Sequence, residues 1–363
     1  MSVRICRHFG ICGGCLYLDK PYDEQLKEKV EYVEELLGVK VERVHPSPKP
    51  HYYRNRMDYV VAPGPKIGLN VRGKWWETID LSECLLLSPE SDTIRGLFRE
   101  FMRRRGLEGW DRRERRGVVR FLSIIEGKFT EERMIFVVSY RYFEGLGDFL
   151  DMLRDEDVKI SSLILGVNDG VRDDAKAGKL YIISGEETIR ERIDKFTYNI
   201  HPNTFFQPNS YTLTNLIEEV IRLSEPEGRE ILELYSGIGT FTIPLSRKAS
   251  KVIAVESDSY AEKVARLNLK ENSVQNVELK HERAERVSHK YGIIVLDPPR
   301  PGLSYKLVKK LRKARPKRIV YVSCNPNSLE RDVRQLGYKI EEVAVIDQFP
   351  QTPLVEVVAL LRR

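Results

Sequence analysis

From Glu230 onward the sequence alternates short apolar segments with segments of helical periodicity, and this alternation restricts the possible folds more than any other feature of the chain. Apolar segments of strand length cover residues 231–234, 251–255, 277–279, 291–296, 318–322, 338–347 and 354–361. Helical segments cover residues 240–248, 259–271, 305–314 and 328–336. The pattern predicts a doubly wound, Rossmann-like α/β domain over residues 196–363, whose last two strands form an antiparallel pair at the edge of the sheet.

The part of the chain before this domain has a different pattern. A length of 363 residues predicts two or three domains. Short strands separated by Gly and Pro turns, including an expected antiparallel hairpin at 118–125 and 134–140, predict a β-rich α+β domain over residues 51–195. Residues 1–50 hold three cysteines and an expected helix at 22–37, which ends at Gly38.

Charge is unevenly distributed along the chain. The net charge is +6, and the segment from Ser91 to Arg120 contains ten arginines against five acidic residues. Such a segment fits either a solvated charged face or contact with a phosphate backbone. The sequence has no apolar run long enough to cross a membrane and no signal-peptide pattern. We therefore expect a soluble, cytoplasmic monomer that does not associate with a membrane and has no obligate protein partner.

Three of the five cysteines are close together in the sequence. Cys6, Cys12 and Cys15 have the spacing C-x5-C-x2-C, and a further cysteine, Cys84, falls in the predicted β-rich domain. Four thiolates suit either a zinc ion or an iron–sulfur cluster, and the alternative is four unrelated thiols. Radical enzymes that use S-adenosylmethionine usually space their cysteines x3 and then x2, so the x5 spacing argues against that class.

The fifth cysteine, Cys324, follows the apolar segment that starts at Ile319 and precedes Asn325 and Pro326. In an open α/β sheet, functional residues gather beyond the carboxyl ends of the strands, which is where this thiol is expected. Asn327 is expected to cap the helix that follows. A buried core cysteine is the alternative interpretation.

Two further motifs follow predicted strands of the same domain. The segment Glu233-Leu-Tyr235-Ser-Gly237-Ile-Gly239 resembles a nucleotide-binding loop without its third glycine, and Glu256 ends the next strand, where a carboxylate can hold ribose hydroxyls. Without a pyrophosphate-binding glycine, S-adenosylmethionine fits this loop better than NAD. Asp297-Pro-Pro-Arg300 follows the fourth strand.

Cys324 and these motifs together favour one chemistry. Uracil C5 is too weak a nucleophile to attack a sulfonium methyl group, but a thiolate that adds at C6 turns C5 into an enolate carbon. After methyl transfer a base must remove the C5 proton so that the thiolate can leave. Glu356, between the last two predicted strands, is the available carboxylate, and Asp297 is expected to hold the uracil edge. The alternative for Glu356 is an ordinary exposed strand residue.

Taken in order, these motifs resemble the S-adenosylmethionine-dependent RNA (uracil-5-)-methyltransferase family over essentially the whole chain. The matching blocks are C-x5-C-G-G-C, Cys84, Phe205-Phe206-Gln207-Pro-Asn209, E-L-Y-S-G-I-G, D-P-P-R, V-S-C-N-P and the terminal V-E. The resemblance implies a [4Fe–4S] cluster held by Cys6, Cys12, Cys15 and Cys84. It also implies cofactor contacts at Gln207, Tyr235, Glu256 and Asp297, with Cys324 as nucleophile, Glu356 as base and Phe205 against the target base.

Two departures from the family pattern affect the expected substrate and site. Leu354 stands where the family usually has His, just before the Val-Glu of the base motif. The chain also starts shortly before Cys6, which leaves no room for the small RNA-binding β-barrel, the TRAM domain, that many members carry. A member with the cluster and without this barrel resembles the branch that methylates 23S rRNA, so rRNA is the expected partner, with tRNA uridine 54 as the alternative.

Two further functions remain as alternatives at this stage. An amino-group methyltransferase would use Asp297-Pro-Pro and would need neither Cys324 nor Glu356. A non-catalytic RNA-binding protein would retain the fold and the cluster but would not bind S-adenosylmethionine.

Overall fold

The computed structural model of the chain describes residues 4–363, which divide into two compact units. The first unit is made of Met1–Pro21, Lys49–Glu191 and His201–Asn203. The second is made of Tyr22–Pro48, Arg192–Ile200 and Thr204–Arg363. Both units are therefore assembled from segments that are distant in the sequence.

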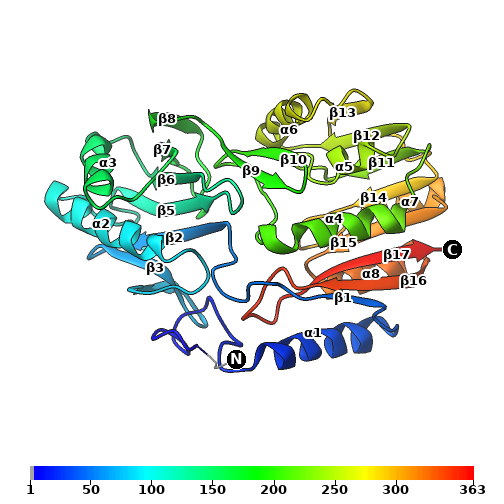
Figure 1. Cartoon of the computed structure of the whole chain (residues 1–363), viewed down its shortest axis with the longest axis horizontal. Helices are drawn as coiled ribbons and strands as arrows, with labels where there is room; N and C mark the ends of the chain where they lie inside the picture. Colours follow the sequence, from blue (N-terminus) through cyan, green and yellow to red (C-terminus); the bar gives the residue numbers. More distant parts are fainter. Residues whose placement is uncertain (1–3) are drawn as a thin grey trace. The chain divides into compact units, whose positions relative to one another are not determined.

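A seven-stranded sheet forms the centre of the first unit (Figure 1). Its order is β4 (Lys74–Asp80), β3 (Lys66–Val71), β2 (Arg56–Ala62), β5 (Val119–Glu126), β6 (Arg133–Ser139), β7 (Ser162–Val167) and β8 (Lys179–Ser184). The predicted hairpin is confirmed, because β5 and β6 pair antiparallel. Strands β6 and β7 are parallel, and α3 (Leu146–Asp155) connects them. This helix packs on α2 (Glu90–Arg105) through an edge-to-face contact of Phe98 with Phe149.

An eight-stranded mixed sheet forms the centre of the second unit, as the alternating pattern predicts. Its order is β1 (Arg43–His45), β16 (Lys339–Ile346), β17 (Glu356–Arg362), β15 (Arg318–Ser323), β14 (Ile293–Leu296), β11 (Glu230–Leu234), β12 (Lys251–Glu256) and β13 (Val277–His281). All neighbouring strands are parallel except β17, which runs antiparallel to both β15 and β16. A two-stranded sheet of β9 (Ile189–Ile193) and β10 (Phe196–Ile200) lies where the chain passes between the units.

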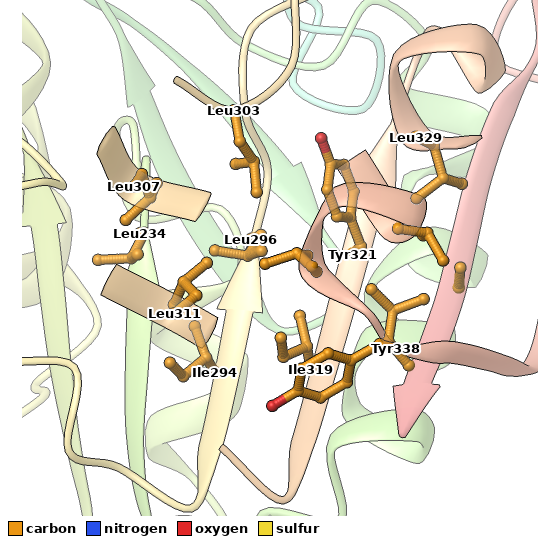
Figure 2. Close-up of a cluster of buried hydrophobic side chains, with 14 of the residues drawn as sticks. Leu234, Ile294, Leu296, Leu303, Leu307, Leu311, Ile319, Tyr321, Leu329 and Tyr338 are labelled. Atoms are coloured by element: carbon orange, nitrogen blue, oxygen red, sulfur yellow. The ribbon is translucent and has the colours of Figure 1, made fainter. Parts of the chain in front are cut away.

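Helices cover both faces of this sheet. On one face α1 (Tyr22–Leu37), α7 (Tyr305–Ala314) and α8 (Pro326–Leu336) share a single apolar layer with the strands, part of which is drawn in Figure 2. Leu307 and Leu311 of α7 pack there against Leu296 and other alternate strand residues. Since successive strand residues point to opposite faces, the remaining strand residues meet α4 (Ser210–Ser224) and α5 (Thr242–Ser246) on the other face. Helix α6 (Ser259–Glu271) packs on β10, β12 and β13.

Two details of the predicted fold are wrong. The final pair of strands is antiparallel, but it does not form the edge of the sheet, because β17 lies inside and the short β1 pairs with β16. Helix α8 begins at Pro326 with Asn325 in the capping position, so Asn327 is not its cap and donates instead to the Tyr32 hydroxyl, 2.6 Å away. A proline in the first turn needs no hydrogen-bond partner for its nitrogen, which explains this start. No helix of residues 4–363 is long and apolar enough to span a membrane.

Candidate active site

Cys324 lies in the short turn between β15 and α8, as its position in the sequence predicts, and its side chain is half-buried. The turn is fastened to the Asp297-Pro-Pro-Arg300 segment by hydrogen bonds. Asn325 Nδ2 donates to the Arg300 carbonyl at 3.0 Å, and Ser328 Oγ donates to the same carbonyl at 2.9 Å. The structure thus brings the turns after β14 and β15 together.

Asp297 follows β14 and accepts a hydrogen bond from Gln207 Nε2 at 3.1 Å. The residue retains some contact with solvent, but its carboxyl is surrounded by protein, and this desolvation raises its pKa to about 7. Gln207 is itself buried. Two residues of the predicted site, from segments far apart in the sequence, are therefore in direct contact.

Glu356 is the first residue of β17 and is almost completely buried, so the interpretation as an exposed strand residue is wrong. Burial, and then the charge of Asp297, raise the pKa of the Glu356 carboxyl well above its ordinary value. Burial and the charges of Glu356 and Asp297 also raise the pKa of the Cys324 thiol to about 11, while the nearby Arg300 guanidinium lowers it. These four side chains form one electrostatically coupled group, in which Cys324 rests as a thiol at neutral pH.

The loop after β11 has an unusual backbone. Tyr235 adopts a positive φ of 64°, which residues other than glycine rarely do. Gly237 and Gly239 have φ values of 56° and 91°. The Glu256 carboxylate links this loop to the one after β12. It accepts from Gly237 N at 2.9 Å and from the backbone N–H groups of Ser257 and Asp258 at 2.6 and 2.7 Å. Tyr235 and Glu256, which the sequence assigns to the cofactor, are thus adjacent.

Glu233 is a residue of this region to which the sequence analysis gave no role. Its side chain is buried, and its Oε2 accepts from Thr242 Oγ1 at 2.6 Å, whereas its Oε1 has no hydrogen-bond partner among residues 4–363. Burial raises its pKa to about 8. The sequence does mark this residue, because it is a glutamate inside an otherwise apolar strand. Burying a carboxyl group costs free energy unless the group has a hydrogen-bond or ionic partner.

Phe205 and Phe206, adjacent in the sequence, have opposite environments. Phe206 is buried, whereas Phe205 is 66% exposed. Core packing therefore explains Phe206 and does not explain Phe205. The following Asn209 accepts from Tyr211 N and caps α4, which fixes the segment that carries Gln207.

Cys6, Cys12, Cys15 and Cys84 line one small pocket in the first unit, together with apolar side chains such as Leu69 and Leu86. Gly14 N donates to Cys12 Sγ at 3.4 Å and His8 N to Cys6 Sγ at 3.5 Å. Burial and the neighbouring thiols raise the pKa of Cys12 to about 11 and that of Cys15 to about 12. Among the described residues, no group of three or more His, Cys, Asp or Glu side chains is close enough to hold a single metal ion.

The overall fold matches one solved structure closely. The crystal structure of the Pyrococcus abyssi tRNA (uracil-54, C5)-methyltransferase in complex with S-adenosyl-L-homocysteine aligns with a TM-score of 0.85 at 37% identity, covering 99% of this chain and 86% of that one. The fold is therefore that of an α/β methyltransferase.

Sequence comparison identifies the family. A family model described as tRNA (Uracil-5-)-methyltransferase matches residues 151–291 and 282–363. The tRNA (uracil(54)-C(5))-methyltransferase of Pyrococcus horikoshii is 40% identical over 98% of this chain and 85% of its own length. The 23S rRNA (uracil(747)-C(5))-methyltransferase of Pyrococcus abyssi is 37% identical over 99% and 85%. The chain belongs to the RNA (uracil-5-)-methyltransferase family, as predicted, and is an enzyme of that class.

Proposed function

We propose that the chain transfers the methyl group of S-adenosylmethionine to C5 of a uridine in tRNA or 23S rRNA, with Cys324 as nucleophile and Glu356 as base. The observation that carries this proposal is the coupling of Cys324, Asp297 and Glu356 at the ends of neighbouring strands.

The proposed reaction has three steps. The half-buried Cys324 thiol gives its proton to solvent as sulfur bonds to uracil C6, and the electron pair of the C5–C6 double bond moves to form an enolate. S-adenosylmethionine, when bound, would supply its methyl group to C5 and leave as S-adenosylhomocysteine. Glu356 removes the C5 proton, the double bond re-forms and the thiolate is expelled. Burial raises the pKa of Glu356 and so makes it a stronger base once ionised.

Four residues are proposed to hold S-adenosylmethionine and the target uracil. Tyr235 and Glu256 lie together at the loops after β11 and β12, where Glu256 would accept from the ribose hydroxyls of S-adenosylmethionine. Gln207 and Asp297, which are hydrogen-bonded to each other, would contact the cofactor and the uracil edge. A carboxyl with a pKa of about 7 can serve there as either donor or acceptor.

Cys6, Cys12, Cys15 and Cys84 are proposed to hold a [4Fe–4S] cluster. The four thiols face one pocket, and a cluster spreads its ligands more widely than a single metal ion does. The buried Arg95, whose Nε and Nη1 atoms have no partner within residues 4–363, acts electrostatically on Cys84 and would offset the negative charge of such a cluster. The cluster would fasten residues 6–15 to the β-rich unit.

The cluster assignment is tested by the purified protein itself. Protein isolated without oxygen is expected to be brown and to contain about four iron atoms and four sulfides per chain. Cys84→Ser should lose this colour. A colourless protein with stoichiometric zinc would contradict the iron–sulfur assignment and support a zinc site.

The RNA substrate is best decided by experiment, since relatives named for tRNA and for 23S rRNA match this chain at 40% and 37% identity. A tRNA and a 23S rRNA fragment, each tritiated at uracil C5, are incubated with the enzyme with and without S-adenosylmethionine. Tritium release that requires the methyl donor and vanishes in Cys324→Ala supports the proposal and identifies the RNA. Methyl incorporation without tritium release would instead support an amino-group methyltransferase.

A further inference from the structure

All three tryptophans of the chain lie on one surface of the first unit. Trp75 and Trp76 are on β4, an edge strand of the seven-stranded sheet, and are 66% and 43% exposed. Trp110 precedes the arginine-rich segment 111–116. We call these three residues, with Tyr140 and Arg112, the tryptophan surface. Trp110 is buried, but exposed aromatic side chains on an edge strand add little to the core and promote aggregation, so folding does not account for Trp75 and Trp76.

The tryptophan surface contains two hollows that share a wall. The first has a volume of about 230 Å³ and is lined by residues that include Trp75, Trp110, Arg115 and Tyr140. The second has a volume of about 280 Å³ and is lined by residues that include Trp76 and Arg113. Trp110 and Arg112 line both hollows. Each hollow is much larger than the space of a single water molecule.

Fixed contacts hold the walls of the first hollow in place. Trp110 stacks on Tyr140 with ring centroids 4.7 Å apart and planes 22° from parallel. The buried Arg120 lies over the Trp110 ring and donates to the carbonyls of Asn168, Gly170 and Arg172, which shapes the adjoining loop. Arg112 donates to the Trp75 carbonyl at 2.6 Å. The site is thus formed before any ligand binds, which lowers the entropic cost of binding.

The charges around the hollows select the kind of partner. Arg113, Arg115 and Arg116 are exposed. The Asp111 carboxylate accepts from two backbone N–H groups. The first hollow is lined by two carboxylates, Asp173, which pairs with Arg112 at 2.7 Å, and Asp169. Exposed aromatic faces beside arginines match the bases and phosphates of a single-stranded nucleic acid. An acceptor such as Asp169 suits an exocyclic amino group of a stacked base.

We propose that the tryptophan surface binds unpaired nucleotides of the substrate RNA, with one base stacked on Trp75 in the first hollow and neighbouring phosphates on Arg113 and Arg115. The inference rests on the proposed function, since it takes the substrate to be RNA. It adds a binding site in the first unit, whereas Cys324 and Glu356 belong to the second. The proposed site takes a nucleotide other than the target uridine.

The three tryptophans make the experiment direct, because no other residue of this type contributes to the fluorescence. Unmodified tRNA or rRNA fragment is titrated into the full-length protein without S-adenosylmethionine, and tryptophan quenching and RNA affinity are measured. Trp75→Ala should weaken RNA binding roughly 5- to 100-fold, as expected for loss of one stacked base. Trp75→Phe, which keeps an aromatic face, should bind nearly as wild type does. Tyr305→Ala, at a 68% exposed aromatic of the second unit, is the matched control.

Two further readouts separate this proposal from the proposed function. In steady-state assays Trp75→Ala should raise KM for RNA and leave KM for S-adenosylmethionine unchanged. The charge reversal Arg113→Glu with Arg115→Glu should weaken RNA binding roughly tenfold or more, because it removes phosphate contacts. If Trp75→Ala binds RNA as tightly as wild type, the tryptophan surface is not an RNA site even though methylation proceeds. If the wild-type protein binds RNA with quenching but transfers no methyl group to C5, the proposed function fails and the surface assignment stands.

Discussion

Glu356 is the residue at which the proposed mechanism can be interrupted most selectively. Glu356→Gln keeps the shape of a buried side chain but cannot accept the C5 proton, so the adduct between Cys324 and C6 should form, take up its methyl group and then persist. Turnover should fall roughly 10²-fold or more. Denaturing gels with labelled RNA should show a stable protein–RNA band. Glu341→Gln, at an exposed residue of β16, is the control. If Glu356→Gln turned over normally and gave no protein–RNA band, Glu356 would be excluded as the base.

Asp297 makes the stability of the ligand-free protein depend on pH. Its pKa rises from an ordinary 3.8 to about 7 on folding, so the folded state binds the proton more tightly. The stability that this proton provides is complete below pH 3.8 and is lost as pH rises toward 7. Raising the pH from 5 to about 8 should therefore lower Tm, and Asp297→Asn should reduce this fall. Calorimetry at both pH values measures the fall in Tm. An equal fall in Tm for Asp297→Asn and wild type would contradict the role assigned to Asp297.

Single residues also show where sequence reasoning ends. The positions of Cys324 and Asp297 beyond strand ends follow from the alternating pattern, because the ends of parallel strands meet at one edge. Their protonation does not follow from it, since desolvation depends on the side chains that fold over each group. Glu233 Oε1 and the Nε and Nη1 atoms of Arg95 have no hydrogen-bond partner within residues 4–363, and this too is a property of the assembled structure.

Helix α1 illustrates a contact between elements that bears on the site. Its Lys29 is buried and donates from Nζ to Asp347 Oδ1 at 2.6 Å and to the Phe349 carbonyl at 2.9 Å. Gln25 of the same helix accepts from Gln351 N at 2.9 Å. All three partners lie in the loop between β16 and β17, which leads into Glu356. Helix α1 therefore holds the segment that presents the proposed base.

Removing this contact should destabilise the second unit. Lys29→Met leaves the buried Asp347 carboxylate without its cation, at a cost of about 3 kcal/mol. For a unit of this size the cost corresponds to a fall in Tm of roughly 6–12 °C. Lys27→Met on the same helix removes an exposed lysine that pairs with the exposed Glu31, so it should change Tm by less than about 2 °C. Equal Tm values for the two mutants would refute the role assigned to Lys29.

The elements themselves were predictable to different degrees. The helix at Tyr22–Leu37 is confirmed, yet its most buried residues include Gln25 and Lys29, which an apolar periodicity does not identify. Strand β1 has only three residues and pairs with β16 almost three hundred residues later, so no local pattern marks it. The position of β17 inside the sheet therefore depends on a long-range strand pairing, which local sequence patterns do not predict.

At the scale of the whole molecule, the net charge of +6 predicts how RNA binding responds to salt. Each phosphate that a cation neutralises releases bound counterions, so affinity for RNA should fall roughly tenfold or more between about 50 and 200 mM KCl. The affinity for S-adenosylmethionine should change little over the same range. Binding isotherms at several salt concentrations measure both. RNA affinity independent of salt would show that the arginine-rich segments do not contact phosphates.

The antiparallel direction of β17 also has a consequence for biosynthesis. Because β17 runs against its neighbours, its first residue, Glu356, lies at the same edge of the sheet as the last residues of β14 and β15. In the sequence, the proposed catalytic base follows every other proposed catalytic and cofactor residue. A nascent or prematurely terminated chain could hold every other proposed catalytic and cofactor residue and still be unable to release a methylated uridine. Only a chain translated through β17, with that strand inserted between β15 and β16, would complete the proposed catalytic cycle.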